Sequence, residues 1–146
     1  MLSNTKILKI KFRNNDVYNI EKHGDWFDLR NVDEIKMIRG DFKFISLGIS
    51  IVLPKGYEAI LAPRSSTFKN FGIIMTNSLG IIDEDYSGDN DIWHFPAYCL
   101  WRESIIPAYS RICQFRIIEH QPNIAFTIST ELENANRGDW GAPEYE

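Results

Sequence analysis

The stretch Ile45-Ser46-Leu47-Gly48-Ile49-Ser50-Ile51-Val52-Leu53 alternates apolar and small or polar residues without a break until Val52. A period of two predicts a β-strand with one face in a core. Pro54-Lys55-Gly56 follows with residues typical of turns. Beyond that turn Tyr57, Ala59 and Leu61 alternate again, so the two runs predict a β-hairpin.

Four further segments have the character of strands: 6–12, 92–100, 112–118 and 124–128. A helix is expected only briefly, after Ser65 or near 33–37. Short strands separated by frequent turn signals are typical of an all-β sandwich or barrel. The sequence therefore predicts an all-β fold with little helix.

The chain of 146 residues is long enough for one core, and we expect a single domain over 1–133 followed by a flexible tail over 134–146. A net charge of −4 argues against a general nucleic-acid surface. No apolar run reaches membrane-spanning length, so we expect a cytoplasmic protein with no membrane partner. Cys99 and Cys113 lie in apolar runs and are expected to be buried, reduced thiols.

A carboxylate stands at the end of an apolar, glycine-punctuated segment, in Gly80-Ile81-Ile82-Asp83-Glu84-Asp85-Tyr86. Partial desolvation by apolar neighbours suits Asp83 to a role as general base. Two alternatives remain: a turn aspartate bonded to its own backbone, and a calcium loop of the EF-hand type. That loop requires a bidentate glutamate where His94 stands, and its flanks should be helices. Tyr86 fits either a core position or a flat surface that excludes a ribose 2′-hydroxyl.

A second signal precedes the first by less than twenty residues. Arg64-Ser65-Ser66-Thr67 combines a guanidinium, hydroxyls and turn amides suited to phosphate, although an ordinary helix N-cap with a surface arginine has the same composition. Gln114 lies within an apolar strand, where its amide either satisfies neighbouring backbone or reaches a water at a site. The three histidines show no metal-ligand spacing.

Taken together, these segments resemble the trimeric deoxyuridine triphosphatase (dUTPase) family, and closely its phage and prophage branch. Four of the five family motifs are readable in order, at 24–29, 63–66, 77–88 and 111–115. The resemblance implies a homotrimer of jelly-roll-like subunits with three active sites shared between subunits. It also implies conversion of dUTP to dUMP and pyrophosphate with Mg²⁺, which substrate phosphates and waters would mainly hold.

The same resemblance assigns roles to individual residues. Asp83 would activate a water that attacks the α-phosphorus, and Tyr86 would lie against the deoxyribose. Asp28 would reach the metal through water, and Gln114 would orient waters around the metal or the substrate. The residues implied in holding phosphates or reading the uracil edge are Arg64, Ser65, Ser66, Asn77, Gly80 and Ile82.

The fifth motif departs from the family pattern. The chain keeps Arg137-Gly138 but replaces the usual Ser-Thr-Gly ending with acidic residues. Arg137 would still reach the γ-phosphate, and Trp140, Trp93 or His94 would cover the uracil ring. Two alternatives stay open: a dUTP-binding trimer with impaired catalysis that regulates a protein partner, and an enzyme of the dCTP deaminase type.

Overall fold

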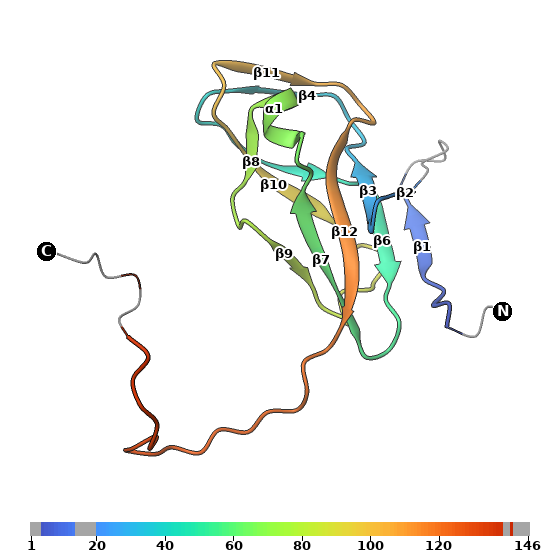
Figure 1. The fold of residues 1–146 in the computed structure, drawn as a ribbon. Helices are drawn as coiled ribbons and strands as arrows, with labels where there is room; N and C mark the ends of the chain where they lie inside the picture. The colour runs from blue at the N-terminus through green and yellow to red at the C-terminus, as the bar shows by residue number, and fades with distance from the viewer. Residues whose placement is uncertain (1–3, 14–19, 139–140, 142–146) are drawn as a thin grey trace, which may run out of the picture.

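The computed structural model describes residues 4–13, 20–138 and 141, and β-strands dominate them (Figure 1). One short helix, α1 (Thr67–Phe71), interrupts the strands. The strands are β1 (Lys9–Phe12), β2 (Glu21–His23), β3 (Trp26–Arg30), β4 (Ile35–Ile38), β5 (Phe42–Ser46), β6 (Ile49–Val52), β7 (Tyr57–Pro63), β8 (Ile73–Met75), β9 (Gly80–Ile82), β10 (His94–Cys99), β11 (Glu103–Ile106) and β12 (Arg111–Glu119). No helix in the described ranges is both long and apolar enough to cross a bilayer.

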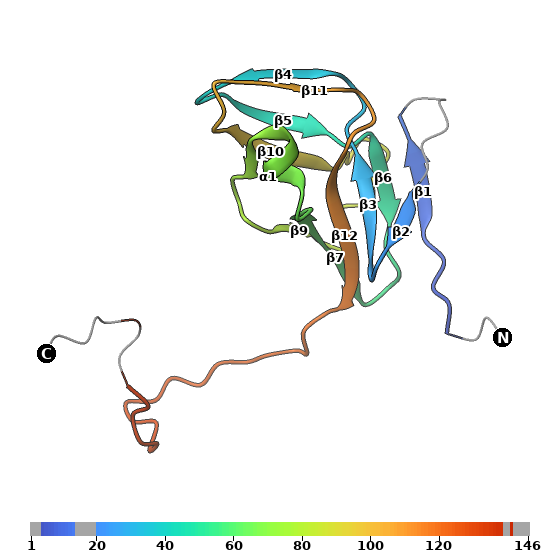
Figure 2. The ribbon, with the colours of Figure 1, turned by 45° about the horizontal axis from the view of Figure 1, so that its top comes forward.

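All strand pairs given by the described residues are antiparallel. The largest sheet has the order β2-β3-β12-β7-β9, with β12 at its centre and β9 at one edge. A second sheet has the order β5-β10-β8, and β1-β6 and β11-β4 form two-stranded pieces (Figure 2). This arrangement confirms the predicted all-β, jelly-roll-like fold with little helix.

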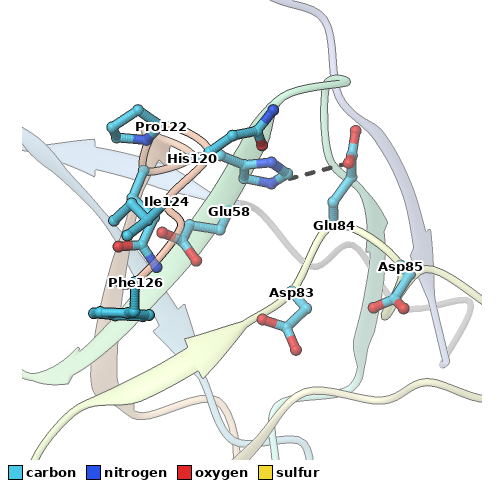
Figure 3. Close-up of a pocket in the computed structure, with 10 residues that line it drawn as sticks. Glu58, Asp83, Glu84, Asp85, His120, Pro122, Ile124 and Phe126 are labelled. Atoms are coloured by element: carbon cyan, nitrogen blue, oxygen red, sulfur yellow. Dashed lines mark ion pairs between the residues drawn. The ribbon is translucent and has the colours of Figure 1, made fainter. Parts of the chain in front are cut away.

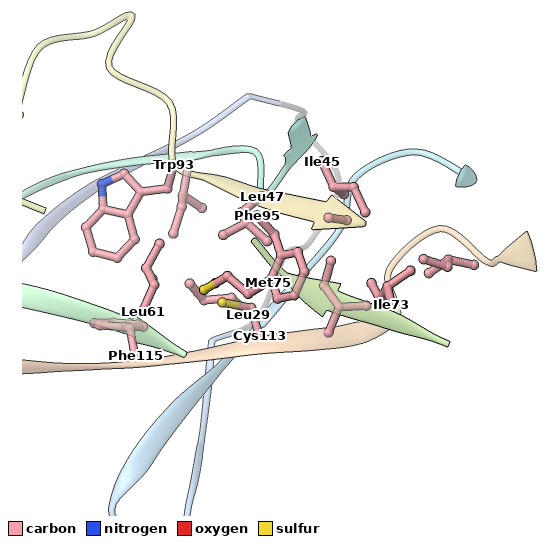
Figure 4. Packing of buried hydrophobic residues seen from close by; sticks show 14 of the residues in the cluster. Leu29, Ile45, Leu47, Leu61, Ile73, Met75, Trp93, Phe95, Cys113 and Phe115 are labelled. Atoms are coloured by element: carbon pink, nitrogen blue, oxygen red, sulfur yellow. The ribbon is translucent and has the colours of Figure 1, made fainter. Parts of the chain in front are cut away.

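The core lies between the five-stranded and three-stranded sheets (Figure 4). Leu61 and Phe115 enter it from the large sheet, and Phe95 and Met75 enter it from the smaller one. Cys99 and Cys113 are buried free thiols, as predicted. Burial of a large apolar side chain stabilises a fold by about 1.5–3 kcal/mol, so these facing sets hold the two sheets together.

The run 45–53 has the predicted buried residues but is not one strand. β5 ends at Ser46 and β6 begins at Ile49, and the two belong to different sheets. Gly48 between them has φ +66, and a Cβ there would lie 2.5 Å from Val32 Cγ2. A glycine in the left-handed region bends the chain here, because only a residue without Cβ fits both the backbone and the space.

The predicted hairpin is wrong. The turn itself forms, since Tyr57 N donates to Pro54 O at 3.1 Å. The flanking strands then diverge: β6 pairs with β1, whereas β7 pairs with β12 and β9. Each strand finds a longer-range partner, which local alternation does not encode.

Two other local expectations need correction. The segment near 33–37 forms strand β4, whereas the short helix expected after Ser65 does form, as α1. The predicted strand 124–128 does not form, and its residues lie in the extended segment 120–138, here called the C-terminal arm. The arm is exposed throughout and runs away from the body (Figures 1 and 2), so within one chain it has no strand to pair with.

Candidate active site

Asp83 directly follows β9, the edge strand of the large sheet. β9 pairs with β7 through Leu61↔Gly80 and Ala59↔Ile82. Gly80 permits this close pairing, because a Cβ on it would lie 3.0 Å from Leu61 Cβ. The carbonyl of Asp83 accepts a hydrogen bond from Tyr86 N at 3.0 Å, which turns the chain immediately after the strand.

A hollow of about 280 Å³ opens beside Asp83. Tyr86 lines it, and its hydroxyl donates to Ile92 O at 3.0 Å, which fixes the ring across the loop. His94 also lines it, with Nδ1 donating to the same carbonyl at 2.8 Å. Sequence reasoning missed Phe44, which stands 6.4 Å from the His94 ring in an edge-on arrangement. The feature that identifies Phe44 is its exposed position on β5, which the structure shows and the sequence does not.

Trp93 lines the same hollow but is 0% exposed. Its ring packs edge-on against Phe115 at 5.3 Å between centroids, and its Nε1 is buried with no hydrogen-bond partner among the described residues. The indole therefore belongs to the wall of the hollow. Its predicted role as a cover over the uracil ring needs correction, because a fully packed core side chain is not free to swing over a ligand.

A larger hollow of about 720 Å³ lies on another side of Asp83 (Figure 3). Glu58, Glu84 and Asp85 line it together with His120 and the start of the C-terminal arm. The hollow is therefore shared between the proposed base and the arm.

The residues expected to bind phosphate lie together at the end of β7 opposite to Asp83. Arg64 Nε donates to Asp28 Oδ1 at 3.0 Å, and its Nη1 donates to Arg111 O at 3.3 Å and to Ser66 Oγ at 3.4 Å. Asp28 is only 3% exposed, and its Oδ2 lies 3.5 Å from Arg111 Nη1. A buried carboxylate between two guanidinium groups holds both of them in place.

Helix α1 begins beside this ion pair. Ser66 occupies its N-cap but makes no side-chain capping bond, so the ordinary capping interpretation does not account for its hydroxyl. Ser65 is exposed. Thr67 fixes the segment instead: its Oγ1 accepts from Arg64 N at 2.8 Å and donates to Ile112 O at 2.9 Å.

A β-bulge supplies the carbonyls in this region. β12 pairs Arg111 with Arg30 and Cys113 with Leu29, so Ile112 is an extra residue relative to β3. Its carbonyl accepts from Thr67 and the preceding carbonyl accepts from Arg64. Gln114, just beyond the bulge, donates from Nε2 to Pro63 O at 3.0 Å, so its amide satisfies neighbouring backbone.

The two groups of residues do not converge within one chain. Ile82 pairs with Ala59, so Asp83 lies near the level of Glu58, six residues along β7 from Arg64. At ~3.3 Å per strand residue the two side chains are separated by about 20 Å. A base and a phosphate clamp must act within a few ångströms of one phosphorus. One chain therefore does not bring Asp83 and Arg64 into one site.

The remaining predicted residues lie on the surface. Asn77 is exposed in the turn between β8 and β9, where Ser78 has φ +59 and its N donates to Met75 O at 3.0 Å. Arg137 is exposed in the C-terminal arm, and Trp140 lies outside the described residues. Burial raises the pKa of the Cys113 thiol to about 12, so this group is not a nucleophile.

No group of three or more His, Cys, Asp or Glu side chains within the described ranges is arranged to hold a metal. Mg²⁺ commonly binds through substrate phosphates, waters and one or two carboxylates. Both oxygens of Asp28 face guanidinium groups.

Comparison with known proteins is consistent with this geometry. The family model described as dUTPase matches residues 17–144. An SPbeta prophage-derived deoxyuridine 5′-triphosphate nucleotidohydrolase of Bacillus subtilis is 47% identical over 137 residues, covering 92% of this chain and 96% of that protein. A deoxyuridine 5′-triphosphate nucleotidohydrolase of Hydrogenobaculum is 36% identical, covering 78% of each chain.

Solved structures share the fold at low identity. A dUTPase from Streptococcus mutans superposes with a TM-score of 0.70 at 18% identity, covering 80% of this chain and 98% of that one. A Staphylococcus bacteriophage 80alpha dUTPase variant with dUpNHpp superposes with a TM-score of 0.75 at 15% identity, covering 89% of this chain and 100% of that one. A phage phi11 dUTPase variant is described with a structural Mg(II) ion.

Proposed function

The chain belongs to the dUTPase family and is a deoxyuridine 5′-triphosphate nucleotidohydrolase, and on this premise we propose how its residues carry out the reaction. Asp83 removes a proton from a water, and the resulting oxygen attacks the α-phosphorus of dUTP. The bond between that phosphorus and the oxygen bridging to the β-phosphate breaks, and pyrophosphate leaves with its electron pair. The products are dUMP, pyrophosphate and one proton.

The observation that carries this proposal is the position of Asp83. Its carboxylate makes no hydrogen bond to a described residue and lines two hollows at the end of an edge strand. A general base needs a free carboxylate within reach of a substrate-bound water. Tyr86, held by Ile92 O, offers a flat face for the deoxyribose in the same hollow.

In this proposal, backbone groups of β9 recognise the uracil ring. Within the described residues β9 pairs only with β7, so the outward N–H and C=O groups of Gly80–Ile82 remain unpaired. An edge strand presents alternating donors and acceptors that match the edge of a pyrimidine ring. Asn77 lies in the turn leading into this edge, and His94 lies at the hollow as a cover for the ring.

The proposed phosphate clamp consists of Arg64, Ser65 and Ser66. Arg64 keeps one Nη group beyond its contacts with Asp28, Ser66 and Arg111, and a guanidinium fits phosphate oxygens in a two-pronged manner. Arg137 would bind the γ-phosphate from the arm. Phosphoryl transfer depends mainly on positioning and charge neutralisation, which these groups supply.

Mg²⁺ is the cofactor of this proposal. When bound to the triphosphate it would neutralise negative charge on the phosphate chain. Asp28 would contact it through water, and Gln114 would orient waters beside the phosphates, with its own orientation set by Pro63 O.

We propose a homotrimer in which Asp83 of one subunit meets Arg64 of the next. The ~20 Å separation along β7 requires a second chain to complete any site. The C-terminal arm also points to a second copy: Ile124, Phe126 and Ile128 alternate along it and are 57%, 93% and 98% exposed. An extended segment with one apolar face is buried most simply by a neighbouring subunit.

The direct test is pyrophosphate release from dUTP, dCTP, dTTP and UTP, with and without Mg²⁺. We expect Mg²⁺-dependent release from dUTP alone among the four. Asp83→Asn should lower kcat at least 100-fold, since loss of a general base typically costs 10²–10⁴-fold. An Asp83→Asn protein as fast as its parent would remove the assigned base.

A second candidate function is a dUTP-binding trimer that regulates a protein partner and turns over slowly. The sequence after Arg137-Gly138 supports it, because acidic residues replace the usual ending there. A bacteriophage 80alpha dUTPase is described as controlling transfer of virulence genes. Tight dUTP binding with turnover far below 1 s⁻¹ would favour this candidate, because ordinary enzymes turn over at roughly 1–10³ s⁻¹. Fast turnover unchanged after removal of 138–146 would exclude it.

A further inference from the structure

Glu84 joins the residue after the proposed base to a distant turn. Its Oε1 accepts a hydrogen bond from Gly56 N at 2.8 Å. Gly56 belongs to the turn between β6 and β7 and has φ +86, a conformation that favours glycine. The Glu84 carboxylate therefore accepts the hydrogen bond of the Gly56 N–H, which has no strand partner in the turn and would otherwise need water.

His120 contacts the same turn and also approaches Glu84, and Figure 3 marks the His120–Glu84 ion pair. Its backbone N donates to Gly56 O at 2.9 Å, and its Nε2 donates to Tyr57 O at 3.0 Å. The same Nε2 lies 3.9 Å from Glu84 Oε2. Three segments far apart in sequence, at 56–57, 84 and 120, are thus linked where the C-terminal arm begins.

Asp83 has few restraints of its own. β9 ends at Ile82, so strand pairing no longer fixes the next residue. The carbonyl of Asp83 accepts from Tyr86 N, and its carboxylate has no hydrogen bond to a described residue. The tether through Glu84 is therefore the side-chain contact that fixes the peptide directly after Asp83.

We propose that Glu84 is a positioning residue for Asp83, an inference that rests on the proposed function. By holding the Asp83–Glu84 peptide against the Gly56 turn, Glu84 keeps the base aimed at its water. Misplacement of a reacting group by about 1 Å costs up to 10²-fold in rate, so a tether one residue away affects the chemical step. Substrate affinity depends on other groups and should change little.

The chain offers a matched control in Glu58. Glu58 lines the same hollow and carries the same charge, and no described residue makes a hydrogen bond or ion pair with its side chain. Removing Glu58 therefore changes the charge near Asp83 without releasing a tether. Comparison of the two positions separates positioning from electrostatics.

The experiment measures kcat and KM for dUTP with full-length protein. Glu84→Met keeps the side-chain length but removes the acceptor, and we expect kcat to fall roughly tenfold with KM within about twofold. Glu84→Gln keeps an amide oxygen for Gly56 N and should stay within about threefold of the parent kcat. Glu58→Met should also stay within about threefold.

Three results overturn the inference: a Glu84→Met kcat equal to that of the parent, a Glu84→Gln loss as large as the Met loss, or an equal loss in Glu58→Met. Thermal unfolding and native mass verify that each variant is folded and assembled. Glu84→Ala replaces Glu84→Met if the latter does not fold. Failure of the proposed function has a different signature, because the parent protein itself would then not hydrolyse dUTP or Asp83→Asn would retain full activity.

Discussion

Two inactive variants should restore each other when their subunits mix. Asp83→Asn removes the base, and Arg64→Gln weakens the phosphate clamp while keeping a donor toward the buried Asp28 carboxylate. Each variant alone should release pyrophosphate at least 100-fold more slowly than the parent. In the proposed trimer, a mixed assembly places an intact Asp83 next to an intact Arg64 on a neighbouring subunit.

The magnitude follows from the geometry of β7. Because the two side chains lie about 20 Å apart within one chain, the proposed site draws them from different subunits. In a random equal mixture, the chance that one subunit supplies the base is one half, and the chance that its neighbour supplies the clamp is also one half. About a quarter of all sites should therefore be intact, and the mixture should regain about a quarter of parental activity.

The assay mixes the two proteins, exchanges their subunits under mild denaturation, and verifies mixed trimers by native mass spectrometry before pyrophosphate release is measured. A parent sample carried through the same exchange provides the reference. Mixed trimers that stay as inactive as the separate variants would refute a site divided between subunits.

Three further predictions concern stability and assembly. Asp28→Asn leaves two guanidinium groups facing a neutral amide and should lower the free energy of unfolding by roughly 3 kcal/mol, measured by urea titration. The pKa of Cys113 is raised from 9.0 to about 12 in the fold, so the contribution of this thiol to stability is complete below pH 9 and is lost as pH rises from about 9 to 12. The urea midpoint of the parent should therefore fall over that pH window, and the midpoint of Cys113→Ala should fall less. Phe126→Ala should leave the subunit folded but weaken trimer assembly by about 2–3 kcal/mol per arm, seen as dissociation on dilution in light scattering.

Alternation predicted burial better than it predicted pairing. Ile45, Leu47, Ile49 and Ile51 are all in the core, as their period of two indicates. The division of that run into two strands depends on the contact between Gly48 and Val32, which is set by the tertiary fold. The hairpin failed for the same reason, since β12 and β1 provide partners that lie far away in sequence.

The sequence was sufficient to predict which residues belong to the candidate site, but not how those residues are arranged in space. Asp83 and Tyr86 do line one hollow, and Arg64 does meet Asp28. Their separation along β7 was not readable without the strand register. Contacts made through backbone, such as that between Glu84 and Gly56, leave no signature in side-chain pattern. The alternation of 124–128 indicates an apolar face correctly, but the chain alone supplies nothing to cover it.

The extra residue at Ile112 has a consequence for how this protein can change in length. Deleting Ile112 would remove the bulge and align β12 with β3 residue by residue. The deletion would also remove the carbonyl that accepts from Thr67 and shift the carbonyl that accepts from Arg64. Replacing Ile112 with another apolar residue leaves both carbonyls in place, so this buried position can change among apolar residue types but cannot be omitted. Gene variants selected for activity should thus tolerate insertions in the 121–123 segment far more readily than any loss between 111 and 113.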